Sequence, residues 1–211
     1  MPDLLLYADA AWESPWVFHV MVALDELNLP YRLEPIRRPI EPELKNQLKT
    51  HALLGLVPTL VHGDFWLTES VAISEYLAET FAPPAHPRIM PADPHERARA
   101  RQVMSWLRTS SMGLRSDRPT TSVFGKRVST PLSEKGRSDA DEVLRIAGQL
   151  ITPTKHSIAS EWCIADADFA LMLMRLVANG DSVPAHIADY ARAQWARPSI
   201  RKYLGYIPAA S

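Results

Sequence analysis

Apolar residues in the first third of the chain recur with two different periods, which predicts a mixed α/β domain. Leu4–Tyr7 is a short apolar run of the kind found in buried strands. From residue 17 to residue 27 the apolar positions then repeat every three or four residues, which predicts an amphipathic helix. Ser14 is a good N-cap, and Pro15 fits the first helical position because its missing N–H needs no partner there. Asn28 predicts the end of this helix, since asparagine tolerates the left-handed conformation.

The next two elements are a strand and a more polar helix. Residues 31–36 predict a strand, and Pro35 places it at an edge of the sheet because proline has no N–H to donate to a neighbour. Residues 41–49 are polar with a weak apolar repeat, which predicts a solvent-facing helix.

A hairpin and a helix complete the first domain. Residues 59–62 alternate and are rich in β-forming types, and residues 65–68 predict a second short strand, joined to the first by the turn pair Gly63-Asp64. An apolar stripe from Ile73 to Phe81 predicts a helix directly after the second strand. The element order is therefore β-α-β-α-β-β-α.

The composition changes after this helix. Five prolines between residues 83 and 94 predict a linker at 83–92, which separates a domain at 1–82 from a domain at 93–211. Beyond the linker the apolar repeats predict helices only, joined by a long ordered loop at 116–135. These helices are expected at residues 93–108, 140–150, 161–179, 184–195 and 198–204.

Charge and length narrow the class of protein. The chain has 211 residues, 46% of them apolar, with 23 basic and 24 acidic side chains. This apolar content is enough for a substantial core. The nearly neutral balance argues against nucleic acid or an anionic membrane as the main partner. No apolar run is long enough to span a membrane, and residues 1–10 lack a basic region before their apolar segment, so we expect neither a membrane span nor a signal peptide.

Cysteine and histidine usage bears on redox chemistry and metals. Cys163 is the one cysteine of the chain, which excludes an intrachain disulfide or a cysteine-cluster metal site and fits the cytoplasm. The seven histidines show no metal-binding spacing, so no metal is expected.

The stretch from Leu56 to Ser70, with Val57-Pro58 before the hairpin and Glu69-Ser70 after it, resembles the glutathione site of cytosolic glutathione transferases. The resemblance extends from Leu4 to about Tyr203. The runs that most resemble bacterial YfcF-type glutathione transferases are FWLTES, AISEYL, ARARQ, SWLR, RP and EWCIADADFALM.

This resemblance implies a fold class and a site. The fold is an α/β, thioredoxin-like N-terminal domain followed by an all-helical C-terminal domain. Glutathione is the co-substrate, and the Ser14 hydroxyl activates its thiol. Val57, before a cis proline, pairs with the peptide through its backbone. Ser70 binds the γ-glutamyl carboxylate, and Glu69 binds the ammonium group.

The resemblance also implies reactions and partners. These are conjugation of glutathione to small hydrophobic electrophiles, glutathione-dependent reduction of hydroperoxides, and a homodimer. The alternative is a non-catalytic, transferase-fold regulatory or interaction protein. Leu56 favours this alternative, because many relatives have a polar residue there that contacts the glycine end of glutathione. His51 is a candidate to make that contact instead.

Simpler roles exist for the same residues. Ser14 and Ser70 are explained as ordinary helix N-caps, and Glu69 as a first-turn partner of the helix dipole. Tyr7, at the end of the first strand, is the alternative to Ser14 as the hydroxyl that donates a hydrogen bond to the glutathione sulfur. In the central helix of the second domain, Cys163 occupies the N-cap position where relatives have Ser or Thr, and a structural acid is expected three residues later.

Overall fold

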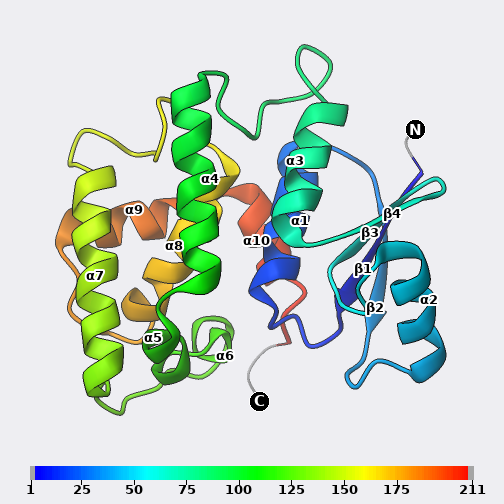
Figure 1. Cartoon of the computed structure of the whole chain (residues 1–211). Coiled ribbons are helices and arrows are strands. Elements are labelled where there is room, and N and C mark those ends of the chain that lie inside the picture. The colour runs from blue at the N-terminus through cyan, green and yellow to red at the C-terminus, as the bar shows by residue number, and fades with distance from the viewer. Residues whose placement is uncertain (1–2, 209–211) are drawn as a thin grey trace. The chain divides into compact units, whose positions relative to one another are not determined.

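The computed structural model describes residues 3–208 and divides into two compact units, Met1–Ile89 and Met90–Ser211 (Figure 1). The outermost ends of the two predicted domains, residues 1–2 and 209–211, lie outside the described residues.

The first unit has the predicted element order β-α-β-α-β-β-α. Its sheet order is β2-β1-β3-β4, with β1 parallel to β2 and antiparallel to β3, and β3 antiparallel to β4. The edge position predicted for the Pro35 strand is confirmed. The elements are β1 Leu4–Asp9, α1 Pro15–Glu26, β2 Arg32–Ile36, α2 Pro42–Ala52, β3 Thr59–His62, β4 Phe65–Thr68 and α3 Ser70–Thr80.

Helices cover both faces of this sheet (Figure 1). Helices α1 and α3 pack against each other on one face, and α2 packs on the other against β4. The β1 side chains alternate accordingly, since Leu4 and Leu6 are fully buried while Leu5 and Tyr7 are half-buried. Helix α1 is buried continuously from Val17 to Leu24, which makes it the central element of this core.

In the described part of the second unit, residues 90–208, the regular elements are helices, and one isolated β-bridge joins Thr152 and Lys155. Helix α8 is buried along almost its whole length and packs against α4, α6 and α9, while α5 packs against α7. The elements are α4 Pro94–Thr109, α5 Met112–Asp117, α6 Thr120–Phe124, α7 Glu134–Leu150, α8 Ile164–Val177, α9 Ala185–Trp195 and α10 Pro198–Leu204.

The segment predicted as a long loop at 116–135 contains the end of α5, all of α6 and the start of α7, so that prediction was wrong in part. Ser111, before α5, has φ of 60° and caps nothing. The Asp139 carboxylate, from α7, instead accepts hydrogen bonds from the amides of Gly113 at 2.8 Å and Leu114 at 3.2 Å. A cap supplied from a distant helix leaves no local signal in the sequence.

Asp139 also forms an ion pair that favours its charged form. It is 7% exposed and pairs with Lys135 at 2.5 Å. Burial opposes its ionisation, but the bonds from Lys135, Leu114 and Gly113 together outweigh this and hold the pKa of Asp139 below its ordinary value.

Two buried arginines hold the helices of this unit together. Arg118 is 3% exposed and binds both carboxylate oxygens of Asp181, at 2.7 and 2.8 Å. Arg175 donates to the Arg118 carbonyl oxygen at 2.6 Å. Because a lone buried charge is costly, these contacts fix the path of the chain around α8.

The N-terminus of α8 is held by the predicted structural acid, Asp166. Its side chain is fully buried and accepts from the Cys163 amide at 2.9 Å, the Ile158 amide at 2.8 Å and the Tyr190 hydroxyl at 2.7 Å. Cys163 stands at the N-cap, so its sulfur occupies the usual place of a hydroxyl in a capping box. Burial, aided by the Asp166 carboxylate, raises the pKa of the Cys163 thiol far above its ordinary value.

Candidate functional site

Strand register brings the segments that carry the predicted site to one end of the sheet. Tyr7 pairs with Thr59 across β1 and β3, and Thr59 pairs with Thr68 across β3 and β4. The chain therefore leaves β1 toward Ser14, enters β3 from Val57, and leaves β4 toward Glu69-Ser70, and all three connections lie at the same end of the strands.

Ser14 is the N-cap of α1, as predicted. Its hydroxyl oxygen accepts from the Val17 amide at 3.3 Å. A serine hydroxyl can both accept and donate hydrogen bonds, so the capping role does not by itself exclude a thiol-activating role.

The turn before Ser14 is fixed by Asp9, which the sequence reasoning missed. Asp9 is 5% exposed, accepts from the Glu13 amide at 3.2 Å and pairs with Arg38 at 3.4 Å. Its carbonyl oxygen accepts from the amide of Trp12, which has φ of 57°. An acid at a strand end next to a short connection is the available signal, because Asp often holds such turns.

Val57 lies between α2 and β3, and its bond to Pro58 is cis, as expected. The side chain is 6% exposed. Within residues 3–208 the structure shows no hydrogen bond from the Val57 amide or to its carbonyl oxygen. Since backbone groups near a core are nearly always paired, this residue presents an edge that an extended peptide can join.

Glu69 and Ser70 occupy adjacent positions at the start of α3. Ser70 is the first residue of the helix and is buried, so the predicted N-cap position of Ser70 was off by one. Glu69 takes the N-cap position instead, is exposed, and has φ of 70° with no capping bond from its side chain. A glutamate with positive φ is a strained conformation that is characteristic of functional sites.

Tyr7, the alternative hydrogen-bond donor to the glutathione sulfur, faces the α2 side of the sheet. Its ring stacks on Trp66 with centroids 5.6 Å apart, and His51 of α2 lies against the same indole at 5.2 Å. These contacts account for Tyr7 as packing. They also place His51 beside the hairpin.

Two negative findings concern the described residues. No group of three or more His, Cys, Asp or Glu in residues 3–208 is arranged to hold a metal ion. In the same part of the chain no helix is both long and apolar enough to cross a bilayer.

A four-stranded mixed sheet between helices, followed by a helical unit, defines the thioredoxin-like plus all-helical architecture that was expected. Family models match both parts: a glutathione S-transferase N-terminal domain at residues 13–80 and a C-terminal domain at residues 93–208. The chain belongs to the glutathione S-transferase family.

Individual relatives agree with this. A glutathione transferase homologue from Burkholderia gl BGR1, solved with bound glutathione, is 34% identical, with 96% of each chain covered and a TM-score of 0.77. A glutathione S-transferase of Hyoscyamus muticus is 26% identical, with 92% of this chain and 94% of that protein covered. One from Arabidopsis thaliana is 34% identical over 91 residues, a match that spans 39% of its length and 43% of this chain.

Proposed function

We propose that this protein is a glutathione transferase that uses the Ser14 hydroxyl to keep bound glutathione as a thiolate. The observation that carries the proposal is that the chain segments bearing Ser14, Val57, Glu69 and Ser70 all adjoin strand ends at one end of the sheet. The bound glutathione in the Burkholderia homologue supports the choice of ligand.

The proposed contacts follow the chemistry of the tripeptide. The Val57 backbone pairs with the peptide as an added strand would. The N-terminus of α3 and the Ser70 hydroxyl bind the γ-glutamyl carboxylate, since a helix N-terminus favours anions. The Glu69 carboxylate binds the ammonium group of the same residue.

Thiol activation requires a definite amount of free energy. A cysteine thiol titrates near pH 8.5, so lowering its pKa by about 2 units needs about 2.7 kcal/mol. A hydroxyl donating to a charged sulfur contributes about 1.5–3 kcal/mol, and a helix N-terminus about 0.3–1 kcal/mol. Ser14, at the N-cap of α1, combines the two.

Two reactions follow from a bound thiolate. In conjugation, the sulfur attacks a small hydrophobic electrophile and the leaving group departs with its electron pair. In hydroperoxide reduction, the sulfur attacks the terminal oxygen and an alcohol leaves after protonation. A second glutathione then attacks the resulting sulfenic acid, which yields glutathione disulfide and water.

Substitution of Ser14 tests the proposal. Ser14→Ala removes the hydroxyl donor and is expected to lower kcat/KM for a chlorinated nitroarene about 10- to 100-fold near neutral pH. Ser14→Asp keeps an N-cap acceptor but has no proton to donate at that pH, so it should restore stability without restoring activity. The control is Ser133→Ala, because Ser133 caps α7 by accepting from the Gly136 amide at 3.0 Å.

The bound thiol is measured directly by its ultraviolet thiolate absorbance as a function of pH. Its pKa should rise in Ser14→Ala and stay unchanged in Ser133→Ala. Full activity in Ser14→Asp would show that Ser14 only caps α1. Unchanged activity in Ser14→Ala, together with a shifted thiol pKa in Tyr7→Phe, would reassign the donor.

The second candidate is a non-catalytic protein of the same family. Leu56 favours it, because an apolar side chain that is 51% exposed stands where many relatives have a polar contact to glutathione. Retention on glutathione-agarose without turnover of a nitroarene or an organic hydroperoxide would support this candidate.

The proposal extends to a homodimer. Leu53, Leu54 and Leu56, between α2 and β3, are all exposed, with Leu53 at 86%. Adjacent exposed apolar side chains of this kind mark contact surfaces between proteins. Light scattering should give twice the mass of one chain for the wild type, and Leu53→Asp should shift the equilibrium toward monomer.

We also infer that the protein belongs to the YfcF-type subfamily and is located in the cytoplasm. The YfcF-type runs of the sequence support membership of that bacterial group. The buried, unpaired Cys163 supports a cytoplasmic location. Recovery of the tagged protein in the cytoplasmic fraction tests the location.

A further inference from the structure

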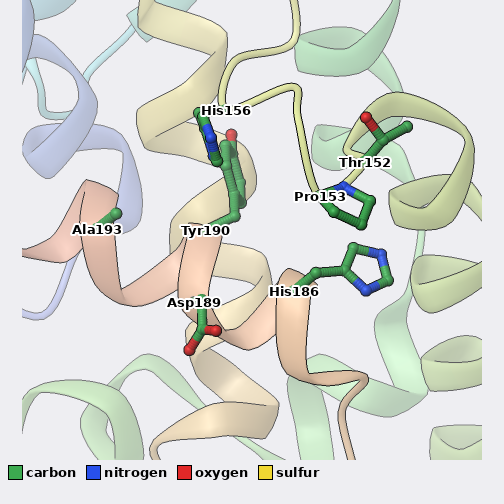
Figure 2. Close-up of a pocket in the computed structure, with 7 residues that line it drawn as sticks. All are labelled: Thr152, Pro153, His156, His186, Asp189, Tyr190 and Ala193. Atoms are coloured by element: carbon green, nitrogen blue, oxygen red, sulfur yellow. The ribbon is translucent and has the colours of Figure 1, made fainter.

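A cavity of about 400 Å³ lies wholly within the second unit, between α9 and the segment that joins α7 to α8 (Figure 2). Its volume falls in the range of roughly 300–1,000 Å³ that is usual for small-molecule sites. None of its residues belongs to the proposed glutathione site. The lining residues are Thr152, Pro153, His156, His186, Asp189, Tyr190 and Ala193.

One wall is a single face of α9. His186, Tyr190 and Ala193 are separated by four and three positions, so they lie one above the other on the helix. The Tyr190 hydroxyl donates to Asp166 at 2.7 Å and the residue is 2% exposed, so its ring is held in place and only a small part of it borders the cavity. This wall is therefore rigid and largely apolar.

The opposite wall is the connecting segment, which is fixed to α9. Gln194 donates from its side chain to the His156 carbonyl oxygen at 3.2 Å, and Thr152 forms a β-bridge with Lys155. The pyrrolidine ring of Pro153 adds a second flat apolar surface (Figure 2). A cavity with both walls fixed needs no reorganisation before a ligand binds.

Two imidazoles supply the polar groups. Within residues 3–208 the structure shows no hydrogen bond, ion pair or ring contact for the side chains of His156 and His186. Asp189 pairs with Arg192 at 3.2 Å, and its carboxylate points away from both imidazoles (Figure 2). Helix α9 has no acidic residue in its first turn, so its positive end near His186 is not offset there.

We propose that this cavity is a second ligand site that takes a small aromatic carboxylate. The apolar lining by Pro153, Ala193 and the ring of Tyr190 suits an aromatic ring, and the size suits one or two fused rings. Each imidazole has an N–H to donate, and a carboxylate accepts on both oxygens. The Thr152 hydroxyl offers a further donor.

The test uses 2-naphthoate as the probe and 2-naphthalenemethanol as its uncharged match. Calorimetry on the full chain, with S-methylglutathione present in excess, should show the carboxylate binding about tenfold more tightly than the alcohol, since hydrogen bonds to a charged group are the stronger. The His156→Ala/His186→Ala double variant should weaken 2-naphthoate about tenfold or more. Ala193→Trp, a substitution at an exposed position, should abolish binding by filling the cavity.

The matched control is His95→Ala, because the His95 side chain is 98% exposed on α4 and lies outside the cavity. Its affinity for 2-naphthoate should equal that of the wild type. Histidine proton NMR should show two imidazole signals that shift with 2-naphthoate and are missing in the double variant. No binding to the wild type, equal affinity for the two probes, full binding to Ala193→Trp, or competition by S-methylglutathione would overturn the proposal.

Discussion

The carboxylate of Asp166 is expected to make a large polar contribution to the stability of the second unit. It is fully buried and serves three donors from three segments: the Cys163 amide at the N-cap of α8, the Ile158 amide before it, and the Tyr190 hydroxyl from α9. Burial raises the pKa of Asp166 above its ordinary value, while these donors act in the opposite direction. Replacing the residue therefore disturbs the helix start and the helix packing together.

The expected magnitude follows from the number of donors left without an acceptor. Each buried donor without a partner costs about 1–3 kcal/mol, so Asp166→Ala should lower the free energy of unfolding by at least about 3 kcal/mol. Asp166→Asn keeps the oxygen that serves Ile158 and Tyr190 and loses only the bond from Cys163, so it should cost about 1–3 kcal/mol. Against a typical total of about 5–15 kcal/mol, the first change removes a large fraction.

Urea unfolding followed by circular dichroism measures these differences. Tyr190→Phe removes one donor and should cost about 1 kcal/mol in the wild type but much less when Asp166 is already Ala, because the two groups share one hydrogen bond. The reasoning is refuted if Asp166→Ala costs under about 1 kcal/mol, or if the two changes add without interaction.

Three further predictions concern Asp139, Glu69 and Arg118. The pKa of Asp139 lies below its value of about 3.9 in the unfolded chain, so its stabilisation is present above that pH and is lost as the pH falls through the folded pKa. The stability difference between wild type and Asp139→Asn should therefore shrink from about pH 5 to about pH 3 in urea titrations, and a constant difference would contradict this. Glu69→Gly removes strain of about 1–3 kcal/mol and adds about 0.5–1 kcal/mol of chain entropy cost, so the thermal midpoint should hold or rise while glutathione affinity falls; a drop in the midpoint with affinity intact would argue against it. Arg118→Ala breaks a buried bidentate pair and should cost about 3–5 kcal/mol in the same urea assay. The exposed pair of Arg145 with Glu142 is equally close at 2.7 Å, but solvent screens it, so Arg145→Ala should leave the free energy of unfolding almost unchanged. Equal losses in the two variants would show that burial is not the cause.

Local signals made most of the first unit predictable. The hairpin at 59–68 was predicted with the observed strand bounds, because two short runs of β-forming residues flank the tight-turn pair Gly63-Asp64. The start of α1 was equally clear, since Ser14 and Pro15 each favour a helix N-terminus. The boundary at Ser70 was displaced by one residue because a glutamate with positive φ at the N-cap goes against ordinary preference.

Features made by distant residues were not predictable. The turns of α5 depend on Asp139, which is 25 or more positions away, and the helices themselves are too short to show a period. The role of Asp9 at the proposed site depends on contacts that form only when the turn closes. The cavity beside α9 is likewise a product of packing, since His156 and His186 are separated by a whole helix in the sequence.

The burial of Cys163 implies that glutathione, and not the protein's own cysteine, supplies the electrons in the proposed peroxide reduction. The chain holds one sulfur capable of thiol chemistry, and that sulfur is 1% exposed and strongly disfavoured as a thiolate. Every reducing equivalent must then be brought in by glutathione, two molecules for each peroxide consumed. The polypeptide is left chemically unchanged by turnover and needs no separate reductase of its own.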